Sequence, residues 1–299
     1  MGRSNTLGRR LFALGWALAL CPGCREGTQV TEAGGLPSAE IVVSAAAASA
    51  RPEPKALPRT SLPALRANWL EPLDLGAGDA AVVSPPLGAT EPRPLVVAVH
   101  GAHDRPEWAC GGWRLGFAQY PFVVCPRGTP VTRDKYAWSN SAAIARATLK
   151  AVARVRERYG EHVAAGPHVF AGFSQGATLA EPFLLEQAAL FPTVILAEGG
   201  YATLDSKRFA QSFAERGGKT VVIVCGTPGC LQRTAPARKR LESAGLRVFE
   251  SGDTRSGHNL NQSMQTALRR DFPSWFASDP SWSSAGSSGA ADGSAGDGG

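Results

Sequence analysis

The chain has 299 residues, 43% of them hydrophobic, and a formal net charge of +6. This length suits one or two domains. The positive charge lies partly near the N-terminus and partly along residues 146–158, with a spacing typical of a solvated helix face. Basic residues interleaved with aromatic ones are absent, so the composition argues against nucleic-acid binding.

Residues 1–24 have the pattern of an export signal. Arginines precede an apolar run at 11–20, which is too short to span a bilayer because a spanning helix needs about twenty residues. Cys21 follows this run and Cys24 comes shortly after, in a context that resembles a bacterial lipoprotein cleavage site. We therefore expect an exported protein, either a periplasmic or cell-envelope lipoprotein with a lipidated N-terminal cysteine or a secreted protein. The alternative is a cytosolic protein with an apolar N-terminus.

Two further segments have the composition of flexible chain. Residues 25–64 are rich in Ala, Pro, Glu and Ser, and residues 278–299 are rich in Ser, Gly, Ala and Asp. Neither holds enough large apolar residues to offset the entropy of ordering. The sequence therefore predicts a disordered tether at 25–64, one well-buried domain at 65–277 and a flexible tail at 278–299.

The cysteines of this domain support export. An even number of cysteines in an exported domain favours disulfides. We expect the pairs Cys110–Cys125 and Cys225–Cys230, because the members of each pair are close in sequence. The spacings match no zinc pattern, so no metal is expected.

Short apolar runs alternate with helical stretches along the domain. Short segments at 95–99, 122–125, 168–171, 194–197, 220–224 and 247–250 are predicted strands. The run at 95–99 has no polar alternation, as is typical of a strand covered on both faces. Helical patterns lie at 141–159, 175–189, 235–244 and 261–276. Gly160 suits the end of the first helix, and Pro182 should bend the second. This alternation predicts an α/β fold, a mostly parallel central sheet with helices on both faces.

The segment Gly172-Phe173-Ser174-Gln175-Gly176 lies between a predicted strand and the helix that follows it. It reads G-x-S-x-G, the pattern of a nucleophile elbow, in which the serine occupies the sharp turn from strand to helix. The flanking glycines leave room where a Cβ would clash. Ser174 is therefore the candidate nucleophile, and the alternative is an ordinary strand–helix turn.

A serine nucleophile needs a base that takes its proton. His258 follows the last predicted strand, well after the serine, and is the best candidate. The other histidines of the domain fit less well, because they lie at strand ends, in a turn or in a helix-end loop: His100, His103, His162 and His168.

The oxygen that becomes charged during attack needs hydrogen-bond donors. His100-Gly101-Ala102 follows the strand at 95–99, and its glycine lets a backbone N–H point into a cleft at the carboxyl end of the sheet. The N–H groups of Ala102 and of Gln175, just after the serine, are the predicted oxyanion hole. The alternative is that this turn only ends a strand.

In this order and context, the histidine–glycine turn, the G-x-S-x-G motif and the glycine–histidine pair after the last strand resemble the α/β-hydrolase fold. The resemblance covers residues 95–276 and is greatest to the carboxylesterase, phospholipase and dienelactone-hydrolase-like branch. It implies that Ser174 is the nucleophile and His258 the base, with the oxyanion held by Ala102 and Gln175. It implies no cofactor and no metal.

This fold serves many chemistries, so the resemblance is less specific for the substrate. We expect an exported serine hydrolase that cleaves carboxylic esters through an acyl-enzyme on Ser174, with a small-molecule or lipid-like ester as substrate. The alternatives are a peptidase or acyltransferase that uses the same serine, and a non-catalytic binding protein on a decayed hydrolase scaffold.

The sequence departs from the family at the catalytic acid, which fixes the tautomer of the base and stabilises its cation. That branch usually carries an aspartate in a turn after the next-to-last strand, but here the turn at 225–231 has no carboxylate. Glu198, at the end of the preceding strand, is the first candidate. Asp253 in the histidine loop is the second, and Asp205 is the third. A dyad without an acid is the remaining alternative.

Overall fold

The computed structural model describes residues 61–283 and 285. Several predictions lie outside these residues: the export signal at 1–24 with its lipid site at Cys21 or Cys24, residues 25–60 of the tether, and residue 284 with 286–299 of the tail. Within the part that is described, no helix combines the length and hydropathy needed to cross a bilayer.

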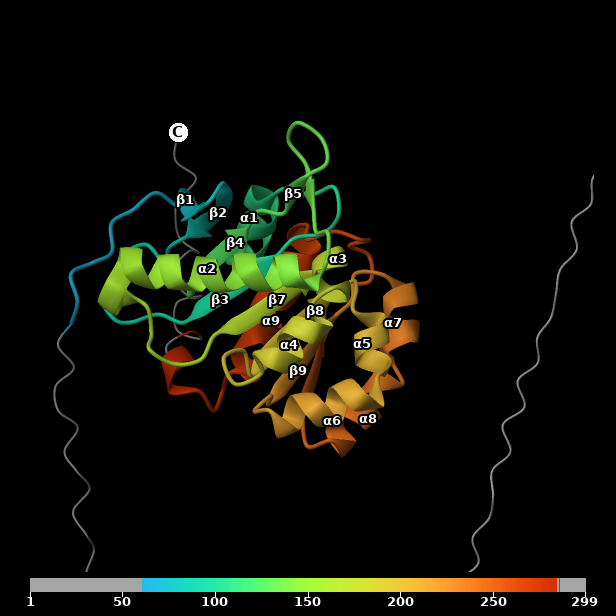
Figure 1. Ribbon diagram of the computed structural model, residues 1–299. Helices are drawn as coiled ribbons and strands as arrows, with labels where there is room; N and C mark the ends of the chain where they lie inside the picture. The colour runs from blue at the N-terminus through green and yellow to red at the C-terminus, as the bar shows by residue number, and fades with distance from the viewer. Residues whose placement is uncertain (1–60, 284, 286–299) are drawn as a thin grey trace, which may run out of the picture. The chain divides into compact units, whose positions relative to one another are not determined.

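A central sheet of eight strands organises the domain (Figure 1). The strands are β1 (Glu71–Gly76), β2 (Asp79–Ser84), β3 (Leu95–Val99), β4 (Phe122–Pro126), β7 (Val169–Phe173), β8 (Thr193–Ala197), β9 (Thr220–Val224) and β10 (Arg247–Ser251). Their order in the sheet is β1-β2-β4-β3-β7-β8-β9-β10. The β1–β2 and β2–β4 pairs are antiparallel, and the other neighbouring pairs are parallel. The carboxyl ends of β3, β7, β8, β9 and β10 therefore lie along one edge.

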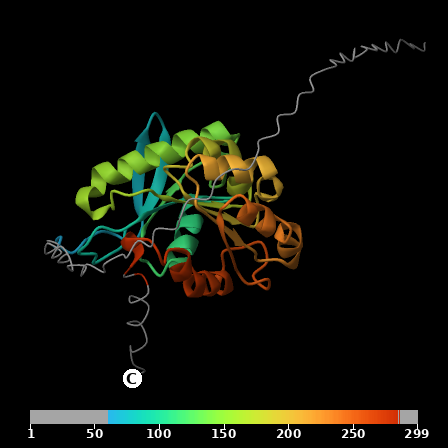
Figure 2. The ribbon, with the colours of Figure 1, turned by 90° about the horizontal axis from the view of Figure 1, so that it is seen from below.

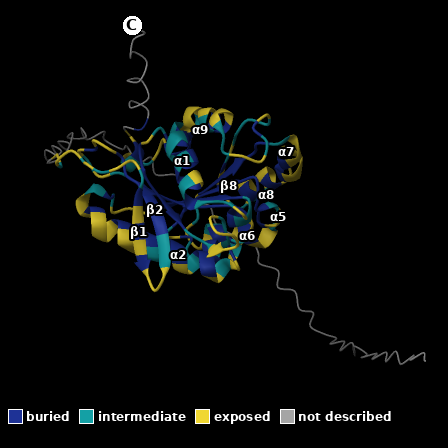
Figure 3. Ribbon diagram, turned by 90° about the horizontal axis from the view of Figure 1, so that it is seen from above, coloured by how far each residue is buried: buried dark blue, intermediate teal, exposed yellow. Residues whose placement is uncertain are grey.

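Helices cover both faces of this sheet. They are α1 (Pro106–Gly116), α2 (Ser141–Tyr159), α3 (Gln175–Thr178), α4 (Glu181–Glu186), α5 (Tyr201–Asp205), α6 (Lys207–Glu215), α7 (Pro228–Thr234), α8 (Ala237–Ser243) and α9 (Gln262–Trp275). One buried cluster joins the sheet to α2, α4, α6 and α8, and a second joins the opposite face to α1 and α9. Figure 2 shows α2 (green) and α9 (red) on opposite sides of the sheet, and Figure 3 shows the buried strands between them. The predicted fold class is confirmed.

Two of the predicted helices are shorter than expected, and in both cases proline is the reason. The predicted helix at 175–189 is divided into α3 and α4, because Pro182 lies in the first turn of α4, where its missing N–H breaks no bond. The predicted helix at 235–244 is reduced to α8, with Pro236 at its N-cap. The other two are correct: α2 has its predicted bounds, and α9 ends within one residue of each expected limit.

The sequence patterns missed several elements outside the main alternation. The antiparallel β1–β2 hairpin was not predicted, and β1 alternates buried and exposed residues around an edge-strand proline, Pro72. A short antiparallel ribbon of β5 (Thr129–Pro130) and β6 (Tyr136–Ala137) was also not predicted. The same is true of the helices α1, α5, α6 and α7. Helices α5 and α7 have only five and seven residues, which is too short for a helical period to be recognised.

The packed domain extends beyond the boundary predicted at 277. A 3₁₀ turn, η2 (Pro280–Trp282), follows α9, and the Trp282 ring stacks on Phe276 with centroids 3.9 Å apart. Trp282 is only 5% exposed. The first residues of the predicted tail are therefore part of the core, because this indole covers the apolar face beside α9.

Both predicted disulfides are confirmed. Cys110 of α1 is bonded to Cys125 of β4, which ties a covering helix to the sheet. Cys225 is bonded to Cys230, which closes the turn between β9 and α7.

His168 is a buried histidine at the start of β7, and both of its ring nitrogens lack a hydrogen-bond partner among the described residues. Burial disfavours its cation and lowers the pKa of His168 to about 4, with a smaller effect from the charge of Arg156. An unfolded histidine has a pKa of about 6.5. Between these values the unfolded state binds more protons than the folded state, so stability falls as the pH falls through this window.

We expect His168→Leu to remove this contribution to acid sensitivity. In the parent it should amount to as much as about 3 kcal/mol between pH 7 and pH 4, and in the variant it should be absent. Free energies of unfolding from urea titrations at several pH values measure the difference. An identical pH dependence in the two proteins would contradict the assignment.

Candidate active site

Ser174 occupies the sharp turn between β7 and α3, with φ 51° and ψ −111°. Residues other than glycine rarely adopt a positive φ, so the surroundings must hold this turn. A Cβ on Gly176 would lie 2.4 Å from the carbonyl oxygen of Val99, and one on Gly172 would lie 2.8 Å from the Cα of Ala177. The two glycines therefore let α3 pack tightly against the sheet, as a nucleophile elbow requires.

The segment after β3 packs directly against this elbow. A Cβ on Gly101 would lie 3.2 Å from the Cβ of Ser174. His100 is fully buried and fixes the segment: its Nδ1–H donates to the Gly101 carbonyl at 2.7 Å, and its Nε2 accepts from the Gly128 N–H at 3.1 Å. Burial lowers the pKa of His100, which favours the neutral ring that these two bonds require. His100 is thus a structural residue of the loop.

The two predicted oxyanion donors, Ala102 and Gln175, follow Gly101 and Ser174 directly in the chain. Ala102 lines the same cavity as Ser174. Gln175 is the first residue of α3, where a backbone N–H has no acceptor within the helix. Its side chain accepts a hydrogen bond from the Trp138 N–H at 2.8 Å, which ties the start of α3 to the neighbouring loop.

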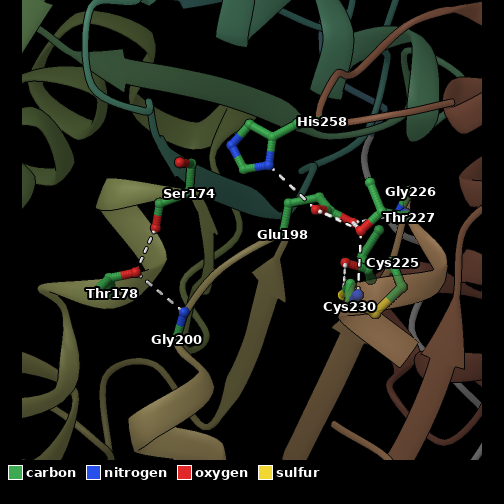
Figure 4. A network of polar contacts seen from close by, with 10 residues as sticks. Ser174, Thr178, Glu198, Gly200, Cys225, Gly226, Thr227, Cys230 and His258 are labelled. Atoms are coloured by element: carbon green, nitrogen blue, oxygen red, sulfur yellow. Dashed lines mark hydrogen bonds and ion pairs between the residues drawn. A yellow bond between two sulfur atoms is a disulfide. The ribbon is translucent and has the colours of Figure 1, made fainter. Parts of the chain in front are cut away.

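His258 and Glu198 are in direct contact, as Figure 4 shows. The His258 Nδ1–H donates to Glu198 Oε2 at 3.2 Å, and the Glu198 side chain is 2% exposed. Glu198 follows β8 with φ 48°, another positive value at a residue other than glycine. Of the three candidate acids, it is the one that the fold brings to the histidine.

The buried Glu198 carboxylate is well supplied with donors. Its Oε1 accepts from the N–H groups of Gly226 at 2.6 Å and Thr227 at 2.9 Å. The Thr227 hydroxyl lies 3.2 Å from each carboxylate oxygen. These bonds offset the cost of removing a carboxylate from water.

Ser174 and His258 line one cavity of about 470 Å³. Trp108, Asn259 and Gln265 also line it, and the His258 side chain is 52% exposed, so the cavity is open to water. In Figure 4 the ring nitrogen of His258 opposite Glu198 lies on the side of Ser174. No hydrogen bond joins the serine hydroxyl to the ring within residues 61–283. Catalytic hydrogen bonds are often long before substrate binds.

The other two candidate acids are engaged elsewhere. Asp253 accepts hydrogen bonds from the side chain and backbone of Arg255, and these lower the pKa of Asp253 to about 2. The Asp205 side chain is 65% exposed and pairs with Arg240 at 2.7 Å. In the described part of the chain neither carboxylate contacts His258. The fold therefore does not bring the second and third candidate acids to the base.

Sequence reasoning missed Gly226 and Thr227. The turn after β9 contains no carboxylate, but its N–H groups donate to the carboxylate at the end of the neighbouring strand, β8. A signal was present, since a threonine before a proline is typical of a helix N-terminus. Thr227 is indeed the N-cap of α7, and its hydroxyl accepts from the Cys230 N–H at 3.1 Å.

Among the described residues, Glu198, Cys225 and Cys230 form a group whose ligand-type atoms are close together. The two sulfur atoms are joined in a disulfide, whereas metals bind thiolates. The carboxylate already has several donors. This group therefore does not fit a metal ion.

No protein-family model matches the chain, and no curated protein matches it. Solved structures do match. A Klebsiella pneumoniae protein named as a dienelactone hydrolase is 15% identical, with a TM-score of 0.51 over 70% of this chain and 98% of its own. An uncharacterized protein from Bacillus cereus is 14% identical, with a TM-score of 0.51 over 64% of this chain and 62% of its own. A ferulic acid esterase is 14% identical, with a TM-score of 0.49 over 68% and 95%.

At such low identity a structural likeness shows the fold alone. The likeness to the Klebsiella protein extends over nearly all of that chain and agrees with the sheet order and the elbow described above. The chain therefore has the α/β-hydrolase fold.

Proposed function

We propose that the protein is an exported serine hydrolase that cleaves carboxylic esters. Ser174 is the nucleophile, His258 the base and Glu198 the acid. The backbone N–H groups of Ala102 and Gln175 hold the oxyanion. The contact between Glu198 and His258, at the cavity that Ser174 lines, is the observation that carries the proposal.

The reaction follows from these positions. His258 Nε2 takes the proton of the Ser174 hydroxyl while the oxygen attacks the ester carbonyl carbon. The tetrahedral oxyanion accepts hydrogen bonds from the two backbone N–H groups. The imidazolium then gives its proton to the leaving alcohol as the C–O bond breaks, and an acyl-enzyme remains. Water attacks this ester with the same proton transfers, which releases the acid and restores the serine.

Glu198 decides which nitrogen of the base is free. Its Oε2 accepts from Nδ1–H, so the neutral ring carries its proton there and Nε2 is left as the acceptor. If Glu198 only capped a helix or lay on the surface, its carboxylate would have no reason to be buried against the His258 ring, as it is here. The same contact argues against a decayed scaffold, for which the missing aspartate was the supporting feature.

The openness of the cavity favours hydrolysis over acyl transfer. Acyl transfer requires that water be kept from the acyl-enzyme, but the base is half exposed. Esters are favoured over amides because an alcohol leaves more readily than an amine. A peptidase remains the alternative that substrate tests distinguish.

Export rests on the N-terminal sequence and on the disulfides. Disulfides persist in oxidising compartments, and both cysteine pairs of the domain are bonded. A lipid on Cys21 or Cys24 would anchor the domain to a membrane. The mass of the mature N-terminal peptide tests this, and an intact, unmodified N-terminus would contradict it.

Labelling with a fluorophosphonate probe tests the hydrolase proposal. We expect the folded full-length chain to react at Ser174, as located by peptide mass spectrometry. The heat-denatured chain, Ser174→Ala and His258→Ala should not react. The parent protein that has not been exposed to the probe should hydrolyse p-nitrophenyl esters faster than the corresponding anilides. A folded parent that does not react would overturn the proposal, and a preference for anilides would favour the peptidase.

A further inference from the structure

We propose that Thr227 and the Cys225–Cys230 disulfide position the catalytic acid, as a clamp that holds Glu198 against His258. The clamp is defined as residues 225–230, and the inference rests on the proposed function. Neither Thr227 nor the disulfide lines the cavity of Ser174, so these groups act through Glu198 and do not touch the substrate.

The clamp supplies the hydrogen bonds to Glu198 other than that from His258. They come from two consecutive residues, Gly226 and Thr227, through two N–H groups and one hydroxyl. A glutamate side chain has several rotatable bonds, so one contact with the histidine would not fix it. Several donors converging on Oε1 orient the carboxylate and leave Oε2 toward the ring.

The Thr227 hydroxyl links the carboxylate to the disulfide. Because a carboxylate only accepts, the hydroxyl donates its proton to Glu198 and uses a lone pair for the Cys230 N–H at 3.1 Å. Cys230 is in turn bonded to Cys225, five residues earlier in the chain. The ring thus closed restrains the two residues that carry the donors. Closing so short a loop contributes less to global stability than closing a long one, so its effect is mainly local.

The clamp also contacts the loop that carries the base. A Cβ on Gly226 would lie 2.2 Å from the carbonyl oxygen of Gly257, the residue before His258. The Cys225 N–H donates to the Ser251 carbonyl at 3.0 Å, at the end of β10. A shift of the clamp would therefore move the acid and the base relative to one another.

Thr227→Val and Thr227→Ser test the hydroxyl. Valine keeps the shape of threonine and its backbone N–H but loses the hydroxyl bonds to Glu198 and to the Cys230 N–H. Serine keeps a hydroxyl that can make both bonds. We expect Thr227→Val to lower kcat for a p-nitrophenyl ester by about 10- to 100-fold with KM unchanged, because a misplacement of about 1 Å can cost about 10²-fold. Thr227→Ser should stay within about twofold of the parent if the hydroxyl bonds are sufficient.

The pH–rate profile separates this role from a purely structural one. Moving a charged group away from the ring changes the electrostatic surroundings of the base, so the midpoint of the profile should differ between Thr227→Val and the parent. A parent-like kcat and midpoint in Thr227→Val would overturn the role of the hydroxyl. If the parent itself did not react with the fluorophosphonate, the proposed function would fail first.

The disulfide has a matched control within the chain. Cys225→Ala with Cys230→Ala should lower kcat at least about 10-fold and move the midpoint in the same direction as Thr227→Val. Cys110→Ala with Cys125→Ala removes the disulfide between α1 and β4 and should keep the parent midpoint. Circular dichroism establishes that each variant is folded. Equal losses of kcat with unchanged midpoints in the two double variants would overturn the positioning role of Cys225–Cys230.

Discussion

Replacing Glu198 with glutamine should lower kcat for ester hydrolysis by about 10⁴-fold, the loss known for the corresponding aspartate-to-asparagine change in a serine triad. The reason is that both carboxylate oxygens accept hydrogen bonds. Oε1 accepts hydrogen bonds from two backbone N–H groups, and Oε2 accepts one from His258. An amide offers one acceptor in place of two.

The backbone donors should decide how the amide turns. If the amide oxygen keeps the N–H groups of Gly226 and Thr227, the NH₂ group faces His258 Nδ1. A neutral ring must then accept at Nδ1 and carry its proton on Nε2, where it cannot take the serine proton. If the amide turns the other way, its NH₂ group meets two buried donors, which is costly. The first arrangement should prevail, with an intact fold and an inactive base.

Asp253→Asn is the matched control for the choice of acid. Its carboxylate binds Arg255 and, within the described residues, does not contact His258. We expect kcat within about twofold of the parent, as for surface changes away from the reacting groups. Steady-state kinetics on a p-nitrophenyl ester measure both variants, with circular dichroism as the check of folding. A large loss in Asp253→Asn together with a small one in Glu198→Gln would reverse the assignment.

The features that could be predicted from sequence are those that local chemistry decides. The strands at Leu95–Val99 and Thr220–Val224 are uninterrupted β-branched or apolar runs, and the structure gives them the bounds expected. The helix Ser141–Tyr159 begins after an asparagine that caps it and ends at Gly160. The glycines beside Ser174 also act locally, through the absence of a Cβ.

The acid depends on contacts between segments that are distant in sequence. Glu198 and His258 are 60 residues apart and meet only because β8 and β10 lie on either side of β9. Sequence alone ranked Glu198 first but left Asp253 and Asp205 as alternatives. What separates them is the neighbouring turn, where Gly226 and Thr227 direct their donors at one carboxylate, and a strand pattern does not contain that information.

Gly176→Ala should destabilise the protein by about 3 kcal/mol or more, at the upper end of the range for overpacked sites. A Cβ at this position would lie 2.4 Å from the Val99 carbonyl oxygen and 2.7 Å from that of His100. Both atoms belong to the backbone, so no side-chain rotation can relieve the contact. The His100 oxygen also accepts the indole N–H of Trp138 at 3.0 Å, and moving it would weaken that bond.

Gly111→Ala provides the control for this prediction, because the same methyl group is added where nothing lies within 4 Å of it. Gly111 lies inside α1, where alanine is favoured over glycine by about 1 kcal/mol, so this variant should be slightly more stable than the parent. Urea unfolding monitored by circular dichroism measures both changes. Equal stability of Gly176→Ala and the parent would mean that α3 can move away from β3, and the tight elbow would then not be required for folding. A destabilised Gly176→Ala that still reacts with the fluorophosphonate when folded would show that the glycine serves packing, and that Ser174 keeps its activation wherever the turn survives.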